Sequence, residues 1–460
     1  MFAGRHVLVA GAGVTGRSAV PALLGLGARV TVTDGNASRL AELGGLGAEL
    51  VSGLSAPPEG TDLVVTSPGW RPTAPLLVAA ADAGIEVIGD VELAWRLSQT
   101  WDSPPVWLTV TGTNGKTTTV GMLESILRAA GVNAVACGNV GFAVLDAVSA
   151  GYDVLAVELS SFQLHWSNTL APQASVVLNV AEDHLDWHGS IQAYAADKGK
   201  VYAHADTVVY NTGDTWSARL AAGHERTVGF RLDTPRPGEV GLVEDLLVDR
   251  AFVADPAHAR ELCTVGDVRP AGPHNLANAL AAAALARAYG VDTDAVAKGL
   301  REFQPGAHRA VEVGEVEGVR YVNDSKATNP HAAAGSLLAH GDVVWIAGGQ
   351  LKGASVDDLV AAVSGHLRGA VLLGVDAEVI AAALARHAPN VHVERVPAGH
   401  DEPMNAAVEA ARRLARPGDV VLLAPAAASL DMFRDYAQRG DAFAGAVRDL
   451  LDRGSASDRG

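Results

Sequence analysis

Short apolar runs alternate with longer Ala/Leu-rich or amphipathic stretches along most of the chain. Near the start, four runs rich in β-branched residues are separated by helical patterns: His6–Ala10, Ala28–Thr33, Leu63–Thr66 and Glu86–Ile88. Apolar runs of this length, bounded by turn residues and alternating with helices, are typical of the buried strands of a parallel sheet. The pattern therefore predicts a parallel α/β unit at the start of the chain.

The same alternation recurs twice further along. The second series has predicted strands at Val106–Val110, Val154–Val157, Ser175–Asn179 and Thr207–Tyr210, and the third at Tyr321–Val322, Val343–Ala347, Ala370–Leu373 and Val420–Ala424. Between Gly213 and Gly272 short alternating runs predict a small β-rich excursion, and Asn278–Tyr289 is Ala-rich and predicted to be helical.

Polar or Pro-bearing segments at Thr100–Pro105 and Phe303–Gly306 mark two boundaries. We therefore predict three α/β domains at residues 1–99, 100–305 and 306–460, each with a mainly parallel sheet. The first and the last are expected to be Rossmann-like and the central one to be of the P-loop type.

Composition narrows the class of protein. Hydrophobic residues make up 48% of the 460 residues, and acidic residues outnumber basic ones by 52 to 35, for a net charge of −17. This charge argues against a non-specific nucleic-acid binder. Two cysteines are too few for a disulfide framework or a four-thiolate zinc site. Apolar runs fall short of the roughly 20 residues of a membrane span, and no signal-peptide pattern opens the chain. We expect a cytoplasmic protein without nucleic-acid or membrane partners.

The first glycine-rich motif is Gly11-Ala12-Gly13-Val14-Thr15-Gly16, directly after a predicted strand. Such a turn lets an anionic group approach backbone amides at a helix N-terminus. Asp34 ends the next strand, where a carboxylate can bond a ribose hydroxyl. Two interpretations stay open here: a site for a nucleotide diphosphate, and glycines that only permit close packing of strand and helix.

The second motif, Thr111–Thr118 (TGTNGKTT), is more specific because it joins an apolar strand to an amphipathic helix. Amides of such a loop surround a triphosphate, Lys116 neutralises its outer phosphates, and the Thr117 hydroxyl can bind Mg²⁺. Val110 stands where the usual pattern has glycine, so the loop is a shortened variant in which Gly112 takes the turn. The motif predicts an ATP site.

Residues suited to metal binding follow. Glu158 lies at the end of a predicted strand, and His184 lies among Glu182, Asp183 and Asp186. Hard oxygen ligands with one imidazole suit Mg²⁺ or Mn²⁺ better than zinc. A helix-capping or core histidine is the alternative for His184, and the three acids receive no role.

Three polar loops of the third series could bind a small carboxylate through charge-assisted and hydroxyl hydrogen bonds. They are Tyr321–Pro330, Ala347–Gly353 and Ala424–Asp431. An exposed loop lysine is the alternative reading of Lys352.

Taken together, these motifs resemble the Mur ligases, ATP-dependent amide-forming enzymes of peptidoglycan synthesis. The resemblance spans nearly the whole chain and rests on both glycine motifs and on Thr66–Gly69, Ala83–Leu93, Gly138–Gly141, Glu158–Leu164, Asn179–His188, Gly272–Ala282, His308-Arg309, Asn323–Asn329 and Ala427–Asp431.

The resemblance is greatest to family members that join D-glutamate to UDP-N-acetylmuramoyl-L-alanine. It implies an acid–D-amino-acid ligase of cell-wall biogenesis, and thus of cell shape and division, that works through an acyl phosphate. Its partners would be those two substrates and ATP with Mg²⁺ or Mn²⁺, and we expect a monomer. The three domains would bind the UDP-substrate, ATP and the amino acid, in that order.

The resemblance also implies site residues. The ATP contacts would be Gly112, Thr113, Asn114, Gly115, Lys116, Thr117, Thr118, Asn275, Asn278, Arg309 and Asp324. Thr117, Glu158, His184 and Lys198 would bind metal, with Lys198 carbamylated, and Lys116, His184 and Lys198 would be catalytic. The UDP-substrate would meet Val14, Thr15, Asp34 and Asn139, and D-glutamate would meet Thr328, Lys352, Ser429 and Tyr436.

Some positions depart from the family pattern or allow another reading. Tyr436 stands where relatives have Phe, and Gly35-Asn36 follow Asp34 where the family can carry Thr-Arg near the uridine diphosphate. Lys198 could instead be an ordinary helix-surface lysine.

Three other functions would account for part of these motifs. A folylpolyglutamate-type or other Mur-family amide ligase would share the ATP loop, but the folylpolyglutamate type would not need the first glycine motif. An oxidoreductase would leave Thr111–Thr118 unexplained, and a non-enzymatic nucleotide switch would give Lys352 and Ser429 no task.

Overall fold

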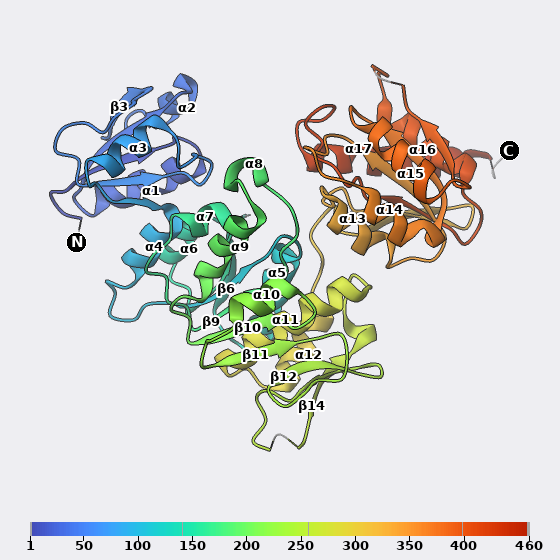
Figure 1. The fold of residues 1–460 in the computed structure, drawn as a ribbon, viewed down its shortest axis with the longest axis horizontal. Helices are drawn as coiled ribbons and strands as arrows, with labels where there is room; N and C mark the ends of the chain where they lie inside the picture. The colour runs from blue at the N-terminus through green and yellow to red at the C-terminus, as the bar shows by residue number, and fades with distance from the viewer. Residues whose placement is uncertain (1, 140, 256, 398, 458–460) are drawn as a thin grey trace. The chain divides into compact units, whose positions relative to one another are not determined.

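The computed structural model describes residues 2–139, 141–255, 257–397 and 399–457, and these residues form three β-sheets flanked by helices (Figure 1). The chain divides into two compact units. The first comprises residues 1–180, 184–267 and 277–303, and the second comprises residues 181–183, 268–276 and 304–460. The first unit holds two of the sheets and the second unit holds the third.

The first sheet has five parallel strands in the order β3-β2-β1-β4-β5. They are β1 His6–Ala10, β2 Arg29–Asp34, β3 Glu49–Ser52, β4 Leu63–Thr66 and β5 Val87–Gly89, with helices α1 Val14–Gly25, α2 Ala37–Glu42, α3 Pro75–Asp82 and α4 Asp90–Ser98. All four predicted strands are present. The edge strand β3 was not predicted, because its side chains are half-buried or exposed and give no apolar run.

The second sheet has nine strands in the order β14-β13-β12-β11-β10-β9-β6-β8-β7. They are β6 Val106–Thr111, β7 Ala134–Gly138, β8 Val154–Glu158, β9 Ala174–Val177, β10 Thr207–Asn211, β11 Thr227–Phe230, β12 Glu239–Val243, β13 Leu246–Asp249 and β14 Arg260–Thr264. The strands from β11 to β14 form the predicted β-rich excursion as an extension of the same sheet, and β13 pairs antiparallel with both β12 and β14. The predicted strand Ser175–Asn179 is too long, because β9 ends at Val177 and Asn179 turns toward the loop after β6.

The helices of this region are α5 Lys116–Ala129, α6 Val144–Ser149, α7 Ser161–His165, α8 Leu185–His188, α9 Ile191–Gly199, η1 Lys200–Tyr202, α10 Thr215–Ala221, η2 Val265–Asp267, α11 Pro273–Tyr289 and α12 Thr293–Glu302. The Ala-rich helix α11 confirms the prediction for Asn278–Tyr289.

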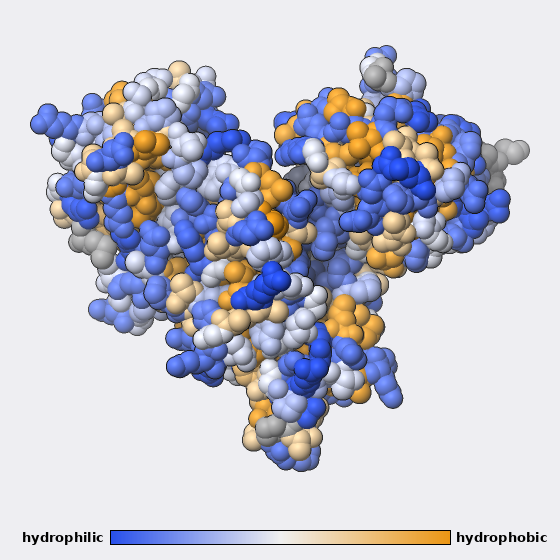
Figure 2. Space-filling model, viewed as in Figure 1, coloured by the Kyte–Doolittle hydropathy of each residue, from blue (hydrophilic) through white to orange (hydrophobic). Residues whose placement is uncertain are grey.

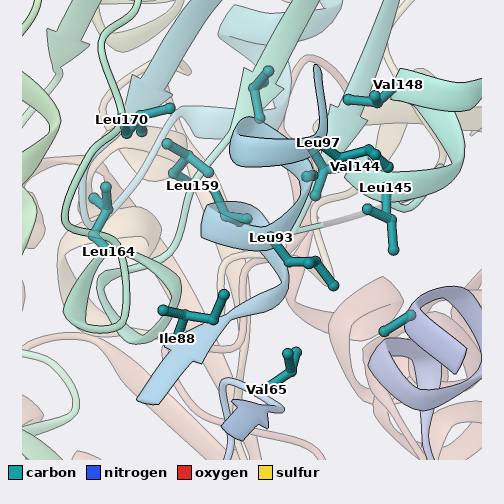
Figure 3. Packing of buried hydrophobic residues seen from close by; sticks show 14 of the residues in the cluster. Val65, Ile88, Leu93, Leu97, Val144, Leu145, Val148, Leu159, Leu164 and Leu170 are labelled. Carbon is teal, nitrogen blue, oxygen red and sulfur yellow. The ribbon is translucent and has the colours of Figure 1, made fainter. Parts of the chain in front are cut away.

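Helix α4 ties the first two sheets together. Its side chains Leu93 and Leu97 pack toward Val144 and Leu145 of α6, as Figure 3 shows. All four are nearly inaccessible to solvent and belong to one hydrophobic cluster that runs from the first sheet into the second. The shared core explains why both sheets belong to one compact unit.

The third sheet has the order β15-β16-β20-β17-β18-β19, and every pair except β15–β16 is parallel. Its strands are β15 Val311–Val316, β16 Val319–Asn323, β17 Val343–Gly348, β18 Leu367–Leu373, β19 His392–Arg395 and β20 Val420–Leu423. The helices are α13 Pro330–Leu337, α14 Asp357–Val363, η3 Ser364–His366, α15 Ala377–His387, α16 Pro403–Leu414 and α17 Tyr436–Ser457. The three central strands β16, β20 and β17 precede the three polar loops of the sequence analysis.

The visible surface is largely hydrophilic, with scattered apolar residues (Figure 2). Within the described ranges, no helix combines the length and the apolar character that crossing a membrane requires.

The domain bounds 1–99, 100–305 and 306–460 stay a prediction.

Candidate functional site

The first glycine motif forms a tight turn between β1 and α1. The Asp34 carboxylate accepts hydrogen bonds from the backbone amides of Ala12 and Asn36, each at 2.8 Å, so it fixes the loop from the neighbouring strand. A Cβ on Gly16 would lie 2.5 Å from the carbonyl oxygen of Gly11, so close packing alone already requires glycine there. Both interpretations of the motif therefore remain compatible with the geometry.

The two residues predicted beside Asp34 lie at the start of α1. Val14 is 62% exposed, whereas the Thr15 hydroxyl is buried and donates to Asp90 at 3.4 Å. Burial raises the pKa of the Asp90 carboxyl to about 6.

The second motif forms a strand–loop–helix at β6 and α5, as predicted. Gly115 has φ of +86° and precedes Lys116 at the helix start, and a Cβ there would lie 2.3 Å from the Asn278 side-chain oxygen. Glycine therefore gives both the left-handed conformation and the close approach of Asn278. Asn179 supports the loop in a way that its place in the sequence did not predict. Its side chain accepts from the Asn114 amide at 2.9 Å and donates to the Asn114 carbonyl at 3.1 Å.

Two lysines converge on this loop. Lys116 Nζ donates to the carbonyl oxygens of Gly112 and Thr113, both at 2.9 Å. Lys198 Nζ from α9 donates to the same Gly112 oxygen at 2.8 Å and lies 4.5 Å from the centre of the Tyr194 ring. Lys198 is 1% exposed, so the surface-lysine alternative is wrong. Such a concentration of positive charge at a glycine-containing loop suits a polyphosphate.

A hydroxyl, a carboxylate and an amide meet beside the loop. The Thr117 hydroxyl donates to Glu158 Oε2 at 2.6 Å, and Asn139 Nδ2 donates to Oε1 of the same carboxylate at 2.9 Å. Glu158 is 2% exposed and ends β8, as predicted. Hard oxygen donors of this kind fit Mg²⁺, which takes few protein ligands alongside phosphates. Val140, in the predicted motif Gly138–Gly141, lies outside the described residues.

His184 directly precedes α8 and adopts φ of 54°. Its ring lies edge-on to Phe162 at 4.8 Å between centroids. Among the described residues no three His, Cys, Asp or Glu side chains come together as a metal site. Glu158 and His184 therefore fit a metal only with other donors, such as phosphate oxygens, the Thr117 hydroxyl or a carbamate on Lys198.

The acidic residues after Asn179 lie in different parts of the fold. Asp186 of α8 forms an ion pair with Arg71 at 2.9 Å, and Arg71 also donates to the Asp186 carbonyl at 3.0 Å. Residues 181–183 belong to the second unit.

In the second unit, three residues predicted to meet D-glutamate follow adjacent parallel strands. Thr328 follows β16, Ser429 follows β20 and Lys352 follows β17, so their loops emerge at one edge of the sheet. Carboxyl ends of parallel strands are the usual ligand-binding edge. Ser429 is 3% exposed, whereas Lys352 is exposed and has φ of 54°.

Tyr436, the fourth predicted contact, begins α17 close to these loops. Its ring lies 3.9 Å from Lys326 Nζ, a cation–π contact, and its carbonyl accepts from the Ser325 hydroxyl at 2.7 Å.

Arg439, one turn further along α17, was missed from the sequence. Its buried guanidinium donates to the Ser325 hydroxyl at 3.0 Å and to the carbonyls of Ser325 and Ala427 at 2.9 and 3.0 Å. A lone arginine in a helical pattern gives no signal of such a role.

The remaining predicted ATP contacts of the second unit are Asn275, which is buried, and Asp324 and Arg309, which are half-buried. Asn275 is 3% exposed and donates to the Ala271 carbonyl at 3.4 Å. Asp324 accepts from the Ala310 amide at 3.2 Å, and burial raises the pKa of the Asp324 carboxyl to about 6.

The chain combines a Rossmann-like sheet, a sheet with a glycine-rich strand–loop–helix beside a hydroxyl–carboxylate pair, and a third, mainly parallel sheet with polar strand-end loops. This combination fits a nucleotide-dependent ligase of the Mur type. Residues 110–286 match the Mur ligase middle domain and residues 308–427 the Mur ligase glutamate ligase domain. Residues 3–80 match the C-terminal domain of alanine dehydrogenase/PNT.

Two of the relatives align with nearly the whole chain and carry the same name. The UDP-N-acetylmuramoylalanine--D-glutamate ligase of Streptomyces coelicolor is 56% identical over 465 residues, covering 98% of this chain and 99% of its own length. The protein of the same name from Thermobifida fusca is 57% identical and covers 97% and 99%. The chain belongs to the Mur ligase family, in the group of the UDP-N-acetylmuramoylalanine--D-glutamate ligases.

Solved structures share the fold at low identity. MurF from Acinetobacter baumannii superimposes with a TM-score of 0.62 at 18% identity, covering 93% of this chain and 91% of its own. UDP-N-acetylmuramate-alanine ligase MurC from Thermotoga maritima gives 0.57 at 18% identity, covering 98% and 99%.

Proposed function

We propose that this protein joins D-glutamate to UDP-N-acetylmuramoyl-L-alanine at the expense of ATP. The observation that carries the proposal is the identity of 56% to a ligase with these substrates in its name, across nearly the full length of both chains. The phosphate-binding loop with Lys116, Thr117 and Glu158 supplies the matching chemistry.

The reaction has two steps. An oxygen of the alanyl carboxylate attacks the γ-phosphorus of ATP, the bond to the β-phosphate oxygen breaks, and ADP and an acyl phosphate form. The neutral amine of D-glutamate then attacks the acyl carbon. The tetrahedral oxyanion collapses, phosphate leaves with the carbon–oxygen bond pair, and the amine proton passes to solvent or a nearby base.

A carboxylate that approaches a triphosphate is repelled, so the first step depends on positive charge and positioning. Lys116, which donates to the loop carbonyls of Gly112 and Thr113, would turn toward the phosphates when a nucleotide binds. Thr117, Glu158, His184 and a carbamylated Lys198 would hold Mg²⁺ or Mn²⁺, which neutralises phosphate charge when bound. Asn139, on the Glu158 carboxylate, would orient the alanyl substrate.

The second unit would supply the amine. Lys352 and Thr328 would offer an ammonium group and a hydroxyl to a carboxylate of D-glutamate. Ser429 and Tyr436 would also contact D-glutamate and line its binding site. Arg309, Asp324, Asn275 and Asn278 would contact the nucleotide.

We propose the bounds 1–99, 100–305 and 306–460 for the three domains. We also propose that the protein acts on small molecules and is a cytoplasmic monomer.

The test is ADP formation with purified protein. We expect release of ADP only when ATP, UDP-N-acetylmuramoyl-L-alanine and D-glutamate are all present, with L-glutamate, L-lysine and L-alanine as controls. Equal turnover with L-glutamate would contradict the D-glutamate assignment. Turnover with a folate substrate in place of the nucleotide-sugar would favour the folylpolyglutamate alternative.

A further inference from the structure

A chain of buried polar side chains connects three short helices around the second glycine motif. The Ser161 hydroxyl lies 3.0 Å from His188 Nε2, and His188 Nδ1 lies 3.1 Å from Asp197 Oδ2. His165 Nδ1 reaches the same carboxylate oxygen at 2.9 Å. Because these residues belong to α7, α8 and α9, the chain joins all three helices.

Asp197 is the centre of this network. Besides the two histidines, its Oδ1 lies 3.4 Å from Lys200 Nζ, and Lys200 also donates to the His165 carbonyl at 2.6 Å. The His188 side chain is 1% exposed, and each of its ring nitrogens has a partner in the network. A buried imidazole that is bonded at both nitrogens has a fixed ring orientation.

Three members of the network, Ser161, His188 and Asp197, lie within four residues along the chain of a residue proposed to bind metal. Glu158 stands just before α7, which begins at Ser161. His184 precedes α8, which ends at His188, and Lys198 directly follows Asp197.

Phe162 couples the network to His184. Its ring stacks on His188, with centroids 5.4 Å apart and planes 15° apart, and meets the His184 ring edge-on at 4.8 Å. His184 has a left-handed backbone, which is uncommon for a residue other than glycine, and α8 has only four residues. A helix this short is not stable without side-chain anchors.

We propose that Ser161, His188 and Asp197 are positioning residues that hold the Glu158, His184 and Lys198 side chains in the arrangement that binds a divalent cation with ATP. This inference rests on the proposed function, because it takes over the metal ligands named there. Groups that orient metal ligands commonly contribute 10- to 100-fold to metal affinity.

The experiment compares two buried serines in the full-length protein, one at the start of α7 and one two residues after its end. Ser161 bonds His188, whereas the Ser167 hydroxyl donates to the Gln163 carbonyl, at 2.9 Å, and is similarly buried. S161A, H188F and the control S167A are titrated with Mn²⁺ in the presence of a non-hydrolysable ATP analogue, and bound Mn²⁺ is followed by electron paramagnetic resonance.

We expect S161A and H188F to weaken Mn²⁺ binding by about 10-fold or more, while S167A leaves it unchanged. The affinity for the analogue without metal and the thermal midpoint of S161A should match those of S167A. Unchanged Mn²⁺ affinity in S161A, or an equal loss in S167A, would overturn the inference. If H188F does not fold, the comparison of S161A with S167A is the test. Because the readout needs no turnover, it stays informative even if the protein proves inactive with D-glutamate.

Discussion

Lys116 and Lys198 donate to one and the same acceptor, the carbonyl oxygen of Gly112, at 2.9 and 2.8 Å. Two ammonium groups that share one acceptor repel each other, and Lys198 is fully enclosed by the protein. Either a bound polyphosphate or conversion of Lys198 to a carbamate relieves this repulsion. A carbamate nitrogen keeps one N–H, so the hydrogen bond to Gly112 can persist after the charge is lost.

Removing the Lys116 charge should impair nucleotide binding and turnover together. We expect K116M to lower kcat/KM for ATP by about 100- to 1,000-fold, because a positioned cation facing the phosphates is lost. Steady-state kinetics and calorimetric titration with an ATP analogue measure the two effects. The exposed Lys298 of α12 offers a control, and an equal loss in K298M would refute the assignment.

Carbamylation of Lys198 predicts a dependence on carbon dioxide. We expect activity to fall in carbon dioxide-free buffer and to return when bicarbonate is added, because the carbamate forms reversibly from the neutral amine. In ¹³C-bicarbonate a carbamate resonance should appear in the nuclear magnetic resonance spectrum of the protein and be absent from K198M. Full activity without carbon dioxide would contradict the carbamate.

We expect Thr117 to contribute to metal binding through its hydroxyl oxygen and not through its methyl group. T117S retains the donor to Glu158 and should keep near-normal activity, whereas T117V should raise the Mg²⁺ concentration needed for half-maximal rate by about 10- to 100-fold. Titrating each variant with Mg²⁺ at saturating ATP separates the two. A T117V enzyme with the Mg²⁺ requirement of the wild type would argue against this residue as a metal contact.

The lowered pKa of the Glu92 carboxyl implies that the stability of the protein depends on pH. Burial acts to raise the pKa of its carboxyl, but hydrogen bonds from the Thr169 hydroxyl, the amides of Thr169 and Asn168 and the Arg96 guanidinium outweigh it and hold the pKa below the ordinary value. The folded state therefore binds fewer protons here than the unfolded state. The Glu92 contribution to stability is complete above the unfolded pKa and is lost as pH falls through the folded one.

Denaturant unfolding from neutral pH down through about pH 4, near the pKa of an unfolded glutamate, and into more acidic buffer measures this contribution. We expect the free energy of unfolding to fall less steeply with acidification in E92Q than in the wild type. Identical slopes would show that Glu92 is not the responsible group.

The buried guanidinium of Arg439 should stabilise the second unit. R439M leaves the carbonyls of Ser325 and Ala427 without their donor, so we expect a loss of about 3–5 kcal/mol in the free energy of unfolding. R448M on the same helix changes an exposed side chain and should stay within about 0.5 kcal/mol. Comparable stability of the two variants in denaturant would disprove the role of Arg439.

Local sequence determined the elements and the second glycine motif. β1 and β4 were predicted with their observed bounds because both are fully buried apolar runs. The strand–loop–helix around Gly115 and Lys116 followed from a strand, a glycine turn and an amphipathic helix that are adjacent in the chain. The edge strand β3 was not predicted, because its half-buried and exposed side chains form no continuous apolar run.

Only the tertiary structure decided which distant residues meet. Lys198 comes to the Gly112 carbonyl from 86 residues away, and Arg439 reaches Ser325 from 114 residues away. Neither contact leaves a periodic trace, because a hydrogen bond between remote segments depends on strand order and helix packing rather than on local spacing. The sequence by itself therefore determined the chemistry that is available, and the packing of sheets and helices decided which groups act together.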